Sequence, residues 1–322
     1  MGKSPSSGAA VFKLRNFVTF ALFVVINFLT TKDTKHTKEE AIAPAKEKVN
    51  VLANIHHWPN DARLAVLPTV MFESWSEGKA PPYSPMTTSL KPGVIDRLGI
   101  SWAEYGGKTG IWRLMRVMDE FNVHATVCIS GKAAEKYPEA ARELHKKGHE
   151  LAGHSYTQDL LLPYVGADEE REVIRRCAGI IEGVTKAKPC GWFSPVAAPT
   201  EHTAEFLGEE GFLWHGDYND TDLPYALETA KGTLVAIPHS DFTDNRVLRG
   251  SPKDFYQVYK DTFDFLYRTE SMGIINLTVH AHFGGRPMMS AMLVEILRYM
   301  KGFPGVWFAR HDEIARWVLG KY

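Results

Sequence analysis

Side chains able to do acid–base chemistry stand at the carboxyl ends of several apolar runs in this sequence. Glu73 directly follows one run, His154 lies near the end of another, and His280 and His282 close a third. Four aspartates follow or end two further runs: Asp217, Asp220, Asp222 and Asp244. Carboxylates and imidazoles serve enzymes as general bases, general acids and metal ligands. If the runs are strands of one barrel, these residues converge on one face, and together they predict a functional site.

Each of these residues taken alone also has a structural explanation. Glu73 can be a surface-loop carboxylate, and His154 can be a core histidine whose ring nitrogens are hydrogen-bonded. Asp220 and Asp222 can simply build the turn before Pro224. The site hypothesis therefore rests on the number of such residues and on their common position at strand ends.

The composition excludes two broad classes of protein. The chain has 322 residues, 44% of them hydrophobic, and 37 Lys and Arg against 38 Asp and Glu. This apolar content is enough to bury a core, which argues against a disordered chain, and the balanced charge argues against nucleic acid as a partner. Three widely spaced cysteines (Cys128, Cys177 and Cys190) without a C-x-x-C pair argue against a disulfide framework or a structural zinc knuckle.

Eight short apolar runs alternate with segments of helical periodicity. The runs are Leu64–Phe72, His124–Ser130, Glu150–Ser155, Pro189–Ser194, Leu213–Tyr218, Leu234–Ser240, Ile274–His282 and Val306–His311. Nearly continuous apolar runs are typical of parallel strands covered on both faces, so the pattern predicts an α/β fold built as a (β/α) barrel. A doubly wound open sheet is the alternative, but no G-x-G-x-x-G follows an early strand. Gly106–Thr109 lacks the strand and upstream glycine of a P-loop.

The first 49 residues differ from the rest. Lys3, Lys13 and Arg15 precede the apolar run Phe17–Leu29, which fits the central region of a signal peptide but has no suitable cleavage site close behind it. A misassigned start or translated repeat DNA is another explanation. We therefore treat residues 1–49 as an extension outside the fold and 50–322 as the catalytic domain. A cytoplasmic location is favoured, with secretion or membrane anchoring as the alternative if residues 13–31 are a genuine signal.

Longer motifs give the chain a family resemblance. They are Tyr105–Arg113, Gly148–Ser155, Gly191–Trp192, Asp217–Tyr225, Val279–Pro287 and Gly305–Ala315. With these motifs, the sequence resembles the polysaccharide deacetylase (NodB-homology, carbohydrate esterase family 4) superfamily, in its allantoinase-like branch. The resemblance covers about residues 60–320. It implies a distorted (β/α) barrel of about seven strands and hydrolysis of non-peptide carbon–nitrogen (amide) bonds.

The chain departs from the family pattern at the expected metal ligands. Typical members carry two aspartates after the first strand and two histidines in a His-Ser-x-x-His motif, whereas this chain has Glu73 alone and pairs His154 with Gln158. A catalytic zinc needs three good nitrogen or oxygen ligands and an open position for water. We therefore expect no certain cofactor. A divalent metal such as zinc would bind, if at all, at a degraded site formed by Glu73 and His154.

The resemblance also assigns roles to residues. Glu73 is expected to act as the base and His280 as the acid, with His154 as a metal ligand or an oxyanion donor. The residues expected to contact substrate are Arg113, Trp192, Asp217, Asp220, Asp222, Asp244 and His282.

Three function classes remain open. The first is an amidohydrolase acting on a small or sugar-linked amide, either a ureide ring or an N-acetyl group. The second is a metal-dependent deacetylase of N-acetyl glycans such as peptidoglycan or chitooligosaccharides, and the third is a non-catalytic binding protein on the same fold. The expected partner is a small-molecule or glycan amide, and self-association as a homo-oligomer is compatible with the aromatic residues Trp307 and Trp317 near the end of the chain.

Overall fold

The computed structural model describes residues 48–49, 58–84, 90–91, 93–240 and 242–322. The chain divides into two compact units, Met1–Ala41 and Ile42–Tyr322, and the first lies wholly outside these described residues. The same holds for the apolar run Phe17–Leu29. The division between an extension and a catalytic domain at residue 49 therefore stays a proposal. Among the described helices, none combines the length and the apolar character needed to cross a membrane.

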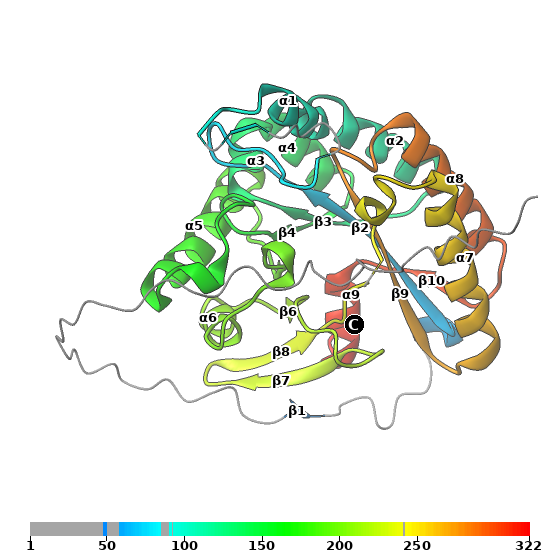
Figure 1. Cartoon of the computed structure of the whole chain (residues 1–322). Helices are drawn as coiled ribbons and strands as arrows, with labels where there is room; N and C mark the ends of the chain where they lie inside the picture. The colour runs from blue at the N-terminus through cyan, green and yellow to red at the C-terminus, as the bar shows by residue number, and fades with distance from the viewer. Residues whose placement is uncertain (1–47, 50–57, 85–89, 92, 241) are drawn as a thin grey trace, which may run out of the picture. The chain divides into compact units, whose positions relative to one another are not determined.

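The second unit is built on one curved sheet of ten strands (Figure 1). The strands are β1 (Lys48–Val49), β2 (Leu64–Phe72), β3 (Thr126–Ile129), β4 (Glu150–Gly153), β5 (Gly191–Trp192), β6 (Trp214–His215), β7 (Tyr225–Thr229), β8 (Gly232–Ala236), β9 (Gly273–His280) and β10 (Val306–Phe308). Every neighbouring pair from β2 to β6, β6 with β8, and β2 with β9 and β10 is parallel, whereas β7 pairs antiparallel with β8 and with β1.

The predicted fold class is confirmed. Each of the eight apolar runs overlaps one strand of the parallel part of the sheet, although β5 and β6 are only two residues long. Strand β7, which forms an antiparallel hairpin with β8, was not predicted from the periodicity, because Tyr225–Thr229 is short and follows a segment with the composition of a turn.

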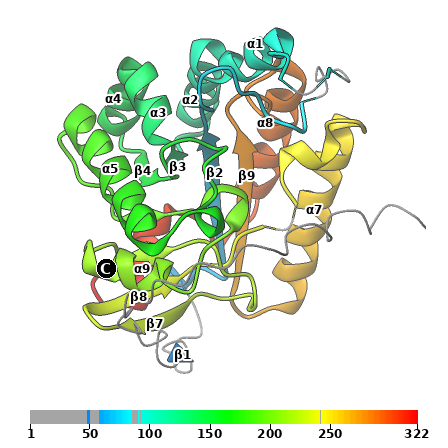
Figure 2. The same cartoon turned by 60° about the vertical axis from the view of Figure 1, so that its left-hand side comes forward.

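Helices separate most of the parallel strands. The α-helices are α1 (Arg97–Tyr105), α2 (Ile111–Phe121), α3 (Gly131–Lys136), α4 (Pro138–Lys146), α5 (Ala167–Thr185), α6 (Thr203–Glu209), α7 (Pro252–Thr269), α8 (Pro287–Lys301) and α9 (His311–Val318). Short helical turns are η2 (Pro59–Asp61), the π-helical η3 (Gly106–Gly110), η4 (Leu162–Tyr164), η5 (Pro195–Ala197) and η6 (Asp244–Val247). Figure 2 shows α2 to α5 and α7 to α8 around the outside of the curved sheet.

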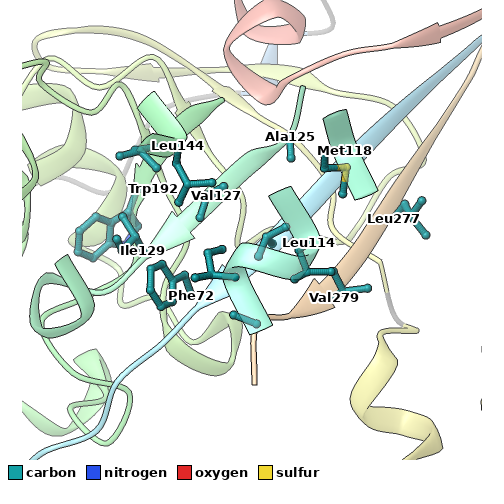
Figure 3. Close-up of a cluster of buried hydrophobic side chains, with 14 of the residues drawn as sticks. Phe72, Leu114, Met118, Ala125, Val127, Ile129, Leu144, Trp192, Leu277 and Val279 are labelled. Atoms are coloured by element: carbon teal, nitrogen blue, oxygen red, sulfur yellow. The ribbon is translucent and has the colours of Figure 1, made fainter. Parts of the chain in front are cut away.

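Two apolar clusters lie on the two faces of the sheet. Along β2, Val70 and Phe72 belong to the outer cluster, whereas Leu67 and Met71 belong to the inner one, as the two-residue repeat of a strand requires. In the outer cluster, Figure 3 shows strand side chains such as Phe72 close to side chains of α2. Helix α9 contributes to the inner cluster. The β2 strand is therefore buried on both faces, which explains its continuous apolar sequence.

The segment that resembles the end of a P-loop is part of a helix. Gly106–Gly110 continues α1 into α2 without a break. A Cβ atom on Gly110 would lie 1.9 Å from the carbonyl oxygen of Ala281. Glycine is therefore needed here for close packing against the segment after β9, and the rejection of a phosphate-binding loop agrees with this helical setting.

Tyr259 of α7 bridges β9 and the segment after β8. Its hydroxyl donates to the carbonyl of Phe242 (2.7 Å) or of Asn276 (3.0 Å) and accepts from the backbone N–H of Thr278 (3.1 Å). The hydroxyl is buried, and burial raises the pKa of Tyr259 to about 12. One phenol thus provides the hydrogen bonds that a neighbouring strand would otherwise supply to β9.

Replacing Tyr259 by Phe should lower the free energy of unfolding by about 2 to 3 kcal/mol, because buried backbone groups lose their partner. Urea denaturation measures the change, with an unchanged m value as evidence of the same folded state. Tyr256→Phe on the same helix is the matched control and should have little effect. Equal stability of Tyr259→Phe and the parent protein would contradict the bridging role.

Candidate active site

The predicted acid–base residues come together at the carboxyl ends of the parallel strands. Glu73 follows β2, His154 follows β4, and His280 is the last residue of β9. Because β2 pairs with both β3 and β9 in parallel, these strand ends lie at one edge of the sheet. Asp244 reaches the same place from η6.

Glu73 is the centre of the cluster. Its side chain is 7% exposed, and its two oxygens face two different histidines: Oε1 lies 3.4 Å from Nε2 of His154, and Oε2 lies 3.6 Å from Nδ1 of His282. Burial by itself raises the pKa of Glu73, but the charge of His280 and the contacts with His154 and His282 outweigh it and lower the pKa to about 2. The carboxylate is therefore ionised at neutral pH.

His280 is held by Asp244. Nδ1 of His280 donates to Oδ1 of Asp244 over 2.6 Å, and the backbone N–H of His280 donates to Oδ2 over 2.9 Å. Burial lowers the pKa of the imidazole, but the charges of Asp244 and Glu73 and the hydrogen bond raise it to about 9. His280 is therefore an imidazolium at neutral pH, and its Nε2–H is not used by Asp244.

A backbone carbonyl group fixes the ring of His154. Its Nδ1 lies 2.6 Å from the carbonyl oxygen of Phe193, so Nδ1 carries a hydrogen and donates, and Nε2 faces Glu73. The next residue, Ser155, has a φ of 59°, a left-handed conformation that is uncommon outside glycine. This local strain turns the chain directly after His154 and keeps the ring at the strand end.

Aromatic rings enclose His282. The ring centroids of Trp102 and Trp75 lie 4.8 and 5.5 Å from that of His282, both edge-on, and the hydroxyl of Tyr83 lies 3.2 Å from Nε2 of His282. Burial is the main reason that the pKa of His282 falls to about 3, so this imidazole is neutral. Burial, with the charges of Glu73 and Asp244, raises the pKa of Tyr83 well above its usual range, so it stays a phenol.

A pocket of about 490 Å³ opens beside Glu73. Its walls come from the loop 74–79, the end of α1 and helix α3 with the following Tyr137. Three lysines and three further glutamates line it: Lys79, Lys132, Lys136, Glu77, Glu104 and Glu135. The volume lies within the range of small-molecule sites.

The donor set does not match a catalytic zinc site. Gln158 stands where the family has its second histidine, and its amide Nε2 donates to the backbone carbonyl of His154 over 3.0 Å. In the part of the chain that the structure describes, no three His, Cys, Asp or Glu side chains are grouped to hold a metal ion. Glu73 and His154 alone leave the coordination one ligand short.

The structure places the predicted substrate residues in two groups. Asp244 and His282 contact the cluster itself, through His280 and Glu73 respectively. The other five have different surroundings. Trp192 is fully buried in the outer apolar cluster, and Arg113 donates to Tyr105 and to the carbonyl of Gly285. Asp217 accepts from His215 and from the backbone N–H of Ser194, Asp220 accepts from Tyr225, and Asp222 lines a separate pocket of about 240 Å³.

Trp192 therefore serves packing rather than the cluster. Its ring sits against the position of Gly153, where a Cβ atom would be 2.7 Å away. Arg113 donates to the carbonyl of Gly285, and so it holds in place the segment after β9 that also carries His282.

Sequence reasoning missed the residues that surround His282. Trp75 and Trp102 lie outside the motifs that carry the family resemblance, and Tyr83 lies in an irregular segment between β2 and α1. No periodicity or spacing links Tyr83 to a histidine 199 positions further along the chain. Only folding brings them together.

Comparison with known proteins gives a consistent set of relatives. A family profile described as polysaccharide deacetylase matches residues 103–212. The crystal structure of a probable polysaccharide deacetylase from Pseudomonas aeruginosa PAO1 is 32% identical, with a TM-score of 0.73 over 81% of this chain and 92% of that chain. The crystal structure of the Puue allantoinase is 30% identical, with a TM-score of 0.75 over 83% and 94%.

A curated relative agrees with these structures. The peptidoglycan deacetylase of Helicobacter pylori is 25% identical over 252 residues, which are 67% of this chain and 86% of that protein. These relatives are matched over most of their length, so the similarity extends well beyond residues 103–212.

The incomplete donor set predicts that the purified full chain, dialysed without chelator, contains much less than one zinc ion per chain. Elemental analysis measures this, and Gln158→His, which restores a third ligand, should raise the zinc content. His154→Ala is the matched loss-of-ligand control. One tightly held zinc ion in the parent protein that is lost in His154→Ala would contradict the prediction.

Proposed function

The chain belongs to the polysaccharide deacetylase family, and we propose that it hydrolyses non-peptide carbon–nitrogen amide bonds with Glu73 as general base and His280 as general acid. The observation that carries this proposal is the pairing of an ionised Glu73 with a protonated His280 at one edge of the sheet. These are the protonation states that a base and an acid need before the reaction begins.

The proposed reaction follows from these two states. Water attacks the amide carbonyl carbon while Glu73 takes one of its protons, which gives a tetrahedral intermediate. The C–N bond then breaks as the Nε2–H of His280 protonates the leaving nitrogen, and the products are a carboxylic acid and an amine. Asp244 stabilises the imidazolium of His280 until its proton is transferred.

The low pKa of Glu73 sets a condition on the first step. A carboxylate with a pKa of about 2 is a weak base toward free water. Proton transfer becomes favourable as attack proceeds, because the water oxygen gains positive charge as it bonds to the carbonyl carbon and its protons become acidic. Negative charge develops at the same time on the substrate oxygen, where a cationic imidazole can stabilise it. His154, whose Nε2 lies 3.4 Å from Glu73, is the candidate donor to this oxyanion when it is protonated.

The pocket favours a small amide as substrate. A volume of about 490 Å³ accommodates a ureide ring or a single N-acetylated sugar. The likeness to an allantoinase supports a ureide, and the likeness to a peptidoglycan deacetylase supports an N-acetyl glycan as the second candidate. The donor set gives no support to a metal-dependent form of that second reaction.

Glu73→Gln should reduce kcat/KM by at least about 10²- to 10³-fold on any substrate that the parent protein hydrolyses, because the amide cannot take a proton from water. The assay uses two substrates, a cyclic ureide and an N-acetylated chitooligosaccharide. Glu295→Gln, which changes a surface glutamate of α8 that pairs with Arg298, is the matched control and should stay close to the parent.

Circular dichroism and thermal melting must show that both variants fold. A folded Glu73→Gln protein with full activity would rule out the base role. A parent protein that binds these compounds without hydrolysing either would favour the non-catalytic alternative. The substrate that is hydrolysed decides between the small-amide and the glycan candidates.

The pH dependence of kcat/KM tests the acid. His280 must be protonated in the free protein, so kcat/KM should be constant through neutral pH and fall above about pH 9, where the imidazolium loses its proton. Asp244→Asn removes the charge that raises this pKa, so the alkaline limit should move down by about one pH unit or more.

Asp119→Asn, a surface carboxylate that pairs with Lys147, is the control and should leave the alkaline limit in place. An alkaline limit that is the same in Asp244→Asn and in the parent would show that His280 is not the titrating acid.

A further inference from the structure

We infer that Tyr83 and His282 form a hydrogen-bonded relay that positions the Glu73 carboxylate, with the Tyr83 hydroxyl donating to Nε2 of His282 and the Nδ1–H of His282 directed at Oε2 of Glu73. Both are positioning residues, because neither donates a group to the reaction. The inference rests on the proposed function only in so far as Glu73 is the base.

The atoms of the relay face one another in a closed space. The Tyr83 hydroxyl lies 3.2 Å from Nε2 of His282, and Nδ1 of His282 lies 3.6 Å from Oε2 of Glu73. The side chain of His282 is 1% exposed and that of Glu73 is 7% exposed. Nδ1 of His282 and Oε2 of Glu73 are both buried, and neither has a hydrogen-bond partner among the described residues. The two atoms lie a few tenths of an ångström beyond hydrogen-bond distance of each other. The Tyr83 hydroxyl is also close enough to Glu73 to hydrogen-bond with it, which raises the pKa of Tyr83, so the relay competes with a direct contact between Tyr83 and Glu73.

The direction of the relay follows from the donors and acceptors. A phenol that donates to Nε2 of a neutral imidazole requires the imidazole hydrogen to be on Nδ1. That hydrogen then points toward the carboxylate, which accepts only. Tyr83 thereby selects the tautomer of His282 that can hold Glu73.

His154 cannot take this role in its neutral form. Its Nδ1–H already donates to the carbonyl of Phe193, which leaves a lone pair on the Nε2 that faces Oε1 of Glu73. The two histidines beside Glu73 therefore differ in kind. His282 can donate to one carboxylate oxygen while neutral, whereas His154 can donate to the other oxygen, Oε1, only when its Nε2 also carries a hydrogen.

The surroundings of His282 hold the relay in one geometry. Trp102 and Trp75 pack edge-on against the ring, at centroid distances of 4.8 and 5.5 Å. Nε of Arg286 donates to the carbonyl of His282 over 3.1 Å. A Cβ atom on Gly106 would lie 3.1 Å from the backbone nitrogen of His282, so the helix backbone approaches closely there. A carboxylate held through such a ring loses little entropy when the reaction needs one orientation.

Histidine tautomers, read by ¹⁵N NMR of the full chain labelled at histidine, test the relay without any substrate. At pH 7, the His282 signals, identified by their loss in His282→Asn, should be those of a neutral ring with hydrogen on Nδ1. In Tyr83→Phe, the ring should shift toward the Nε2–H tautomer. An Nε2–H ring in the parent protein, or an unchanged tautomer in Tyr83→Phe, would overturn the relay; the second result would mean that Tyr83 acts on Glu73 directly.

Kinetics test the consequence for Glu73. The Asn side chain keeps an N–H close to the position of Nδ1, whereas Leu keeps the volume without a donor. His282→Leu should lower kcat about 10- to 100-fold with little change in KM, and His282→Asn should recover most of the loss. Equal kcat in the parent, Leu and Asn proteins would overturn the relay while leaving the base role of Glu73 intact.

The experiments distinguish failure of the relay from failure of the proposed hydrolytic function. If the tautomers behave as expected but the parent protein hydrolyses neither test substrate, the relay stands and the proposed function fails. If hydrolysis depends on Glu73 but the tautomer of His282 ignores Tyr83, the function stands and the relay fails.

Discussion

The charge of one buried carboxylate organises this protein's candidate active site. Removing an ionised group such as Glu73 from water is costly unless cationic or hydrogen-bonding groups replace the water. Here the replacement comes from three imidazoles on two strand ends, His154, His280 and His282, and their combined effect exceeds the penalty of burial, since the pKa of Glu73 falls to about 2. The positions of β2, β4 and β9 are therefore tied together by the requirements of a single negative charge.

His280 and His282 show how the surroundings give two identical side chains different protonation states. His280 and His282 are two residues apart and have ring centroids 5.4 Å apart. Asp244 contacts His280 and raises its pKa to about 9, whereas the rings around His282 offer no charge of their own, and burial lowers its pKa to about 3. Because the pKa values of these two neighbouring histidines shift in opposite directions, His280 can serve as an acid while His282 is a neutral hydrogen-bond donor.

The missing third metal ligand is connected to this arrangement. Gln158 uses its amide on the carbonyl of His154, and so it supports the histidine instead of extending the donor set. In the part of the chain that the structure describes, no three His, Cys, Asp or Glu side chains are grouped to hold a metal ion, and the positive charge beside Glu73 comes from the imidazolium of His280. This is consistent with a site that works through proton transfer between paired side chains.

The fold class, the eight strands of the parallel part of the sheet and the convergence of three acid–base side chains at strand ends could be predicted from the sequence. The eight apolar runs became strands because residues covered on both faces must be apolar along their whole length, and Glu73, His154 and His280 were found because they stand at strand ends. The tertiary structure decided the rest. Trp192 and Asp217 look like site residues in the sequence, but packing and the pairing with His215 occupy them elsewhere. Tyr83 carries no local signal in the sequence, because its contact with His282 forms only when the fold brings the segment after β2 next to the end of β9.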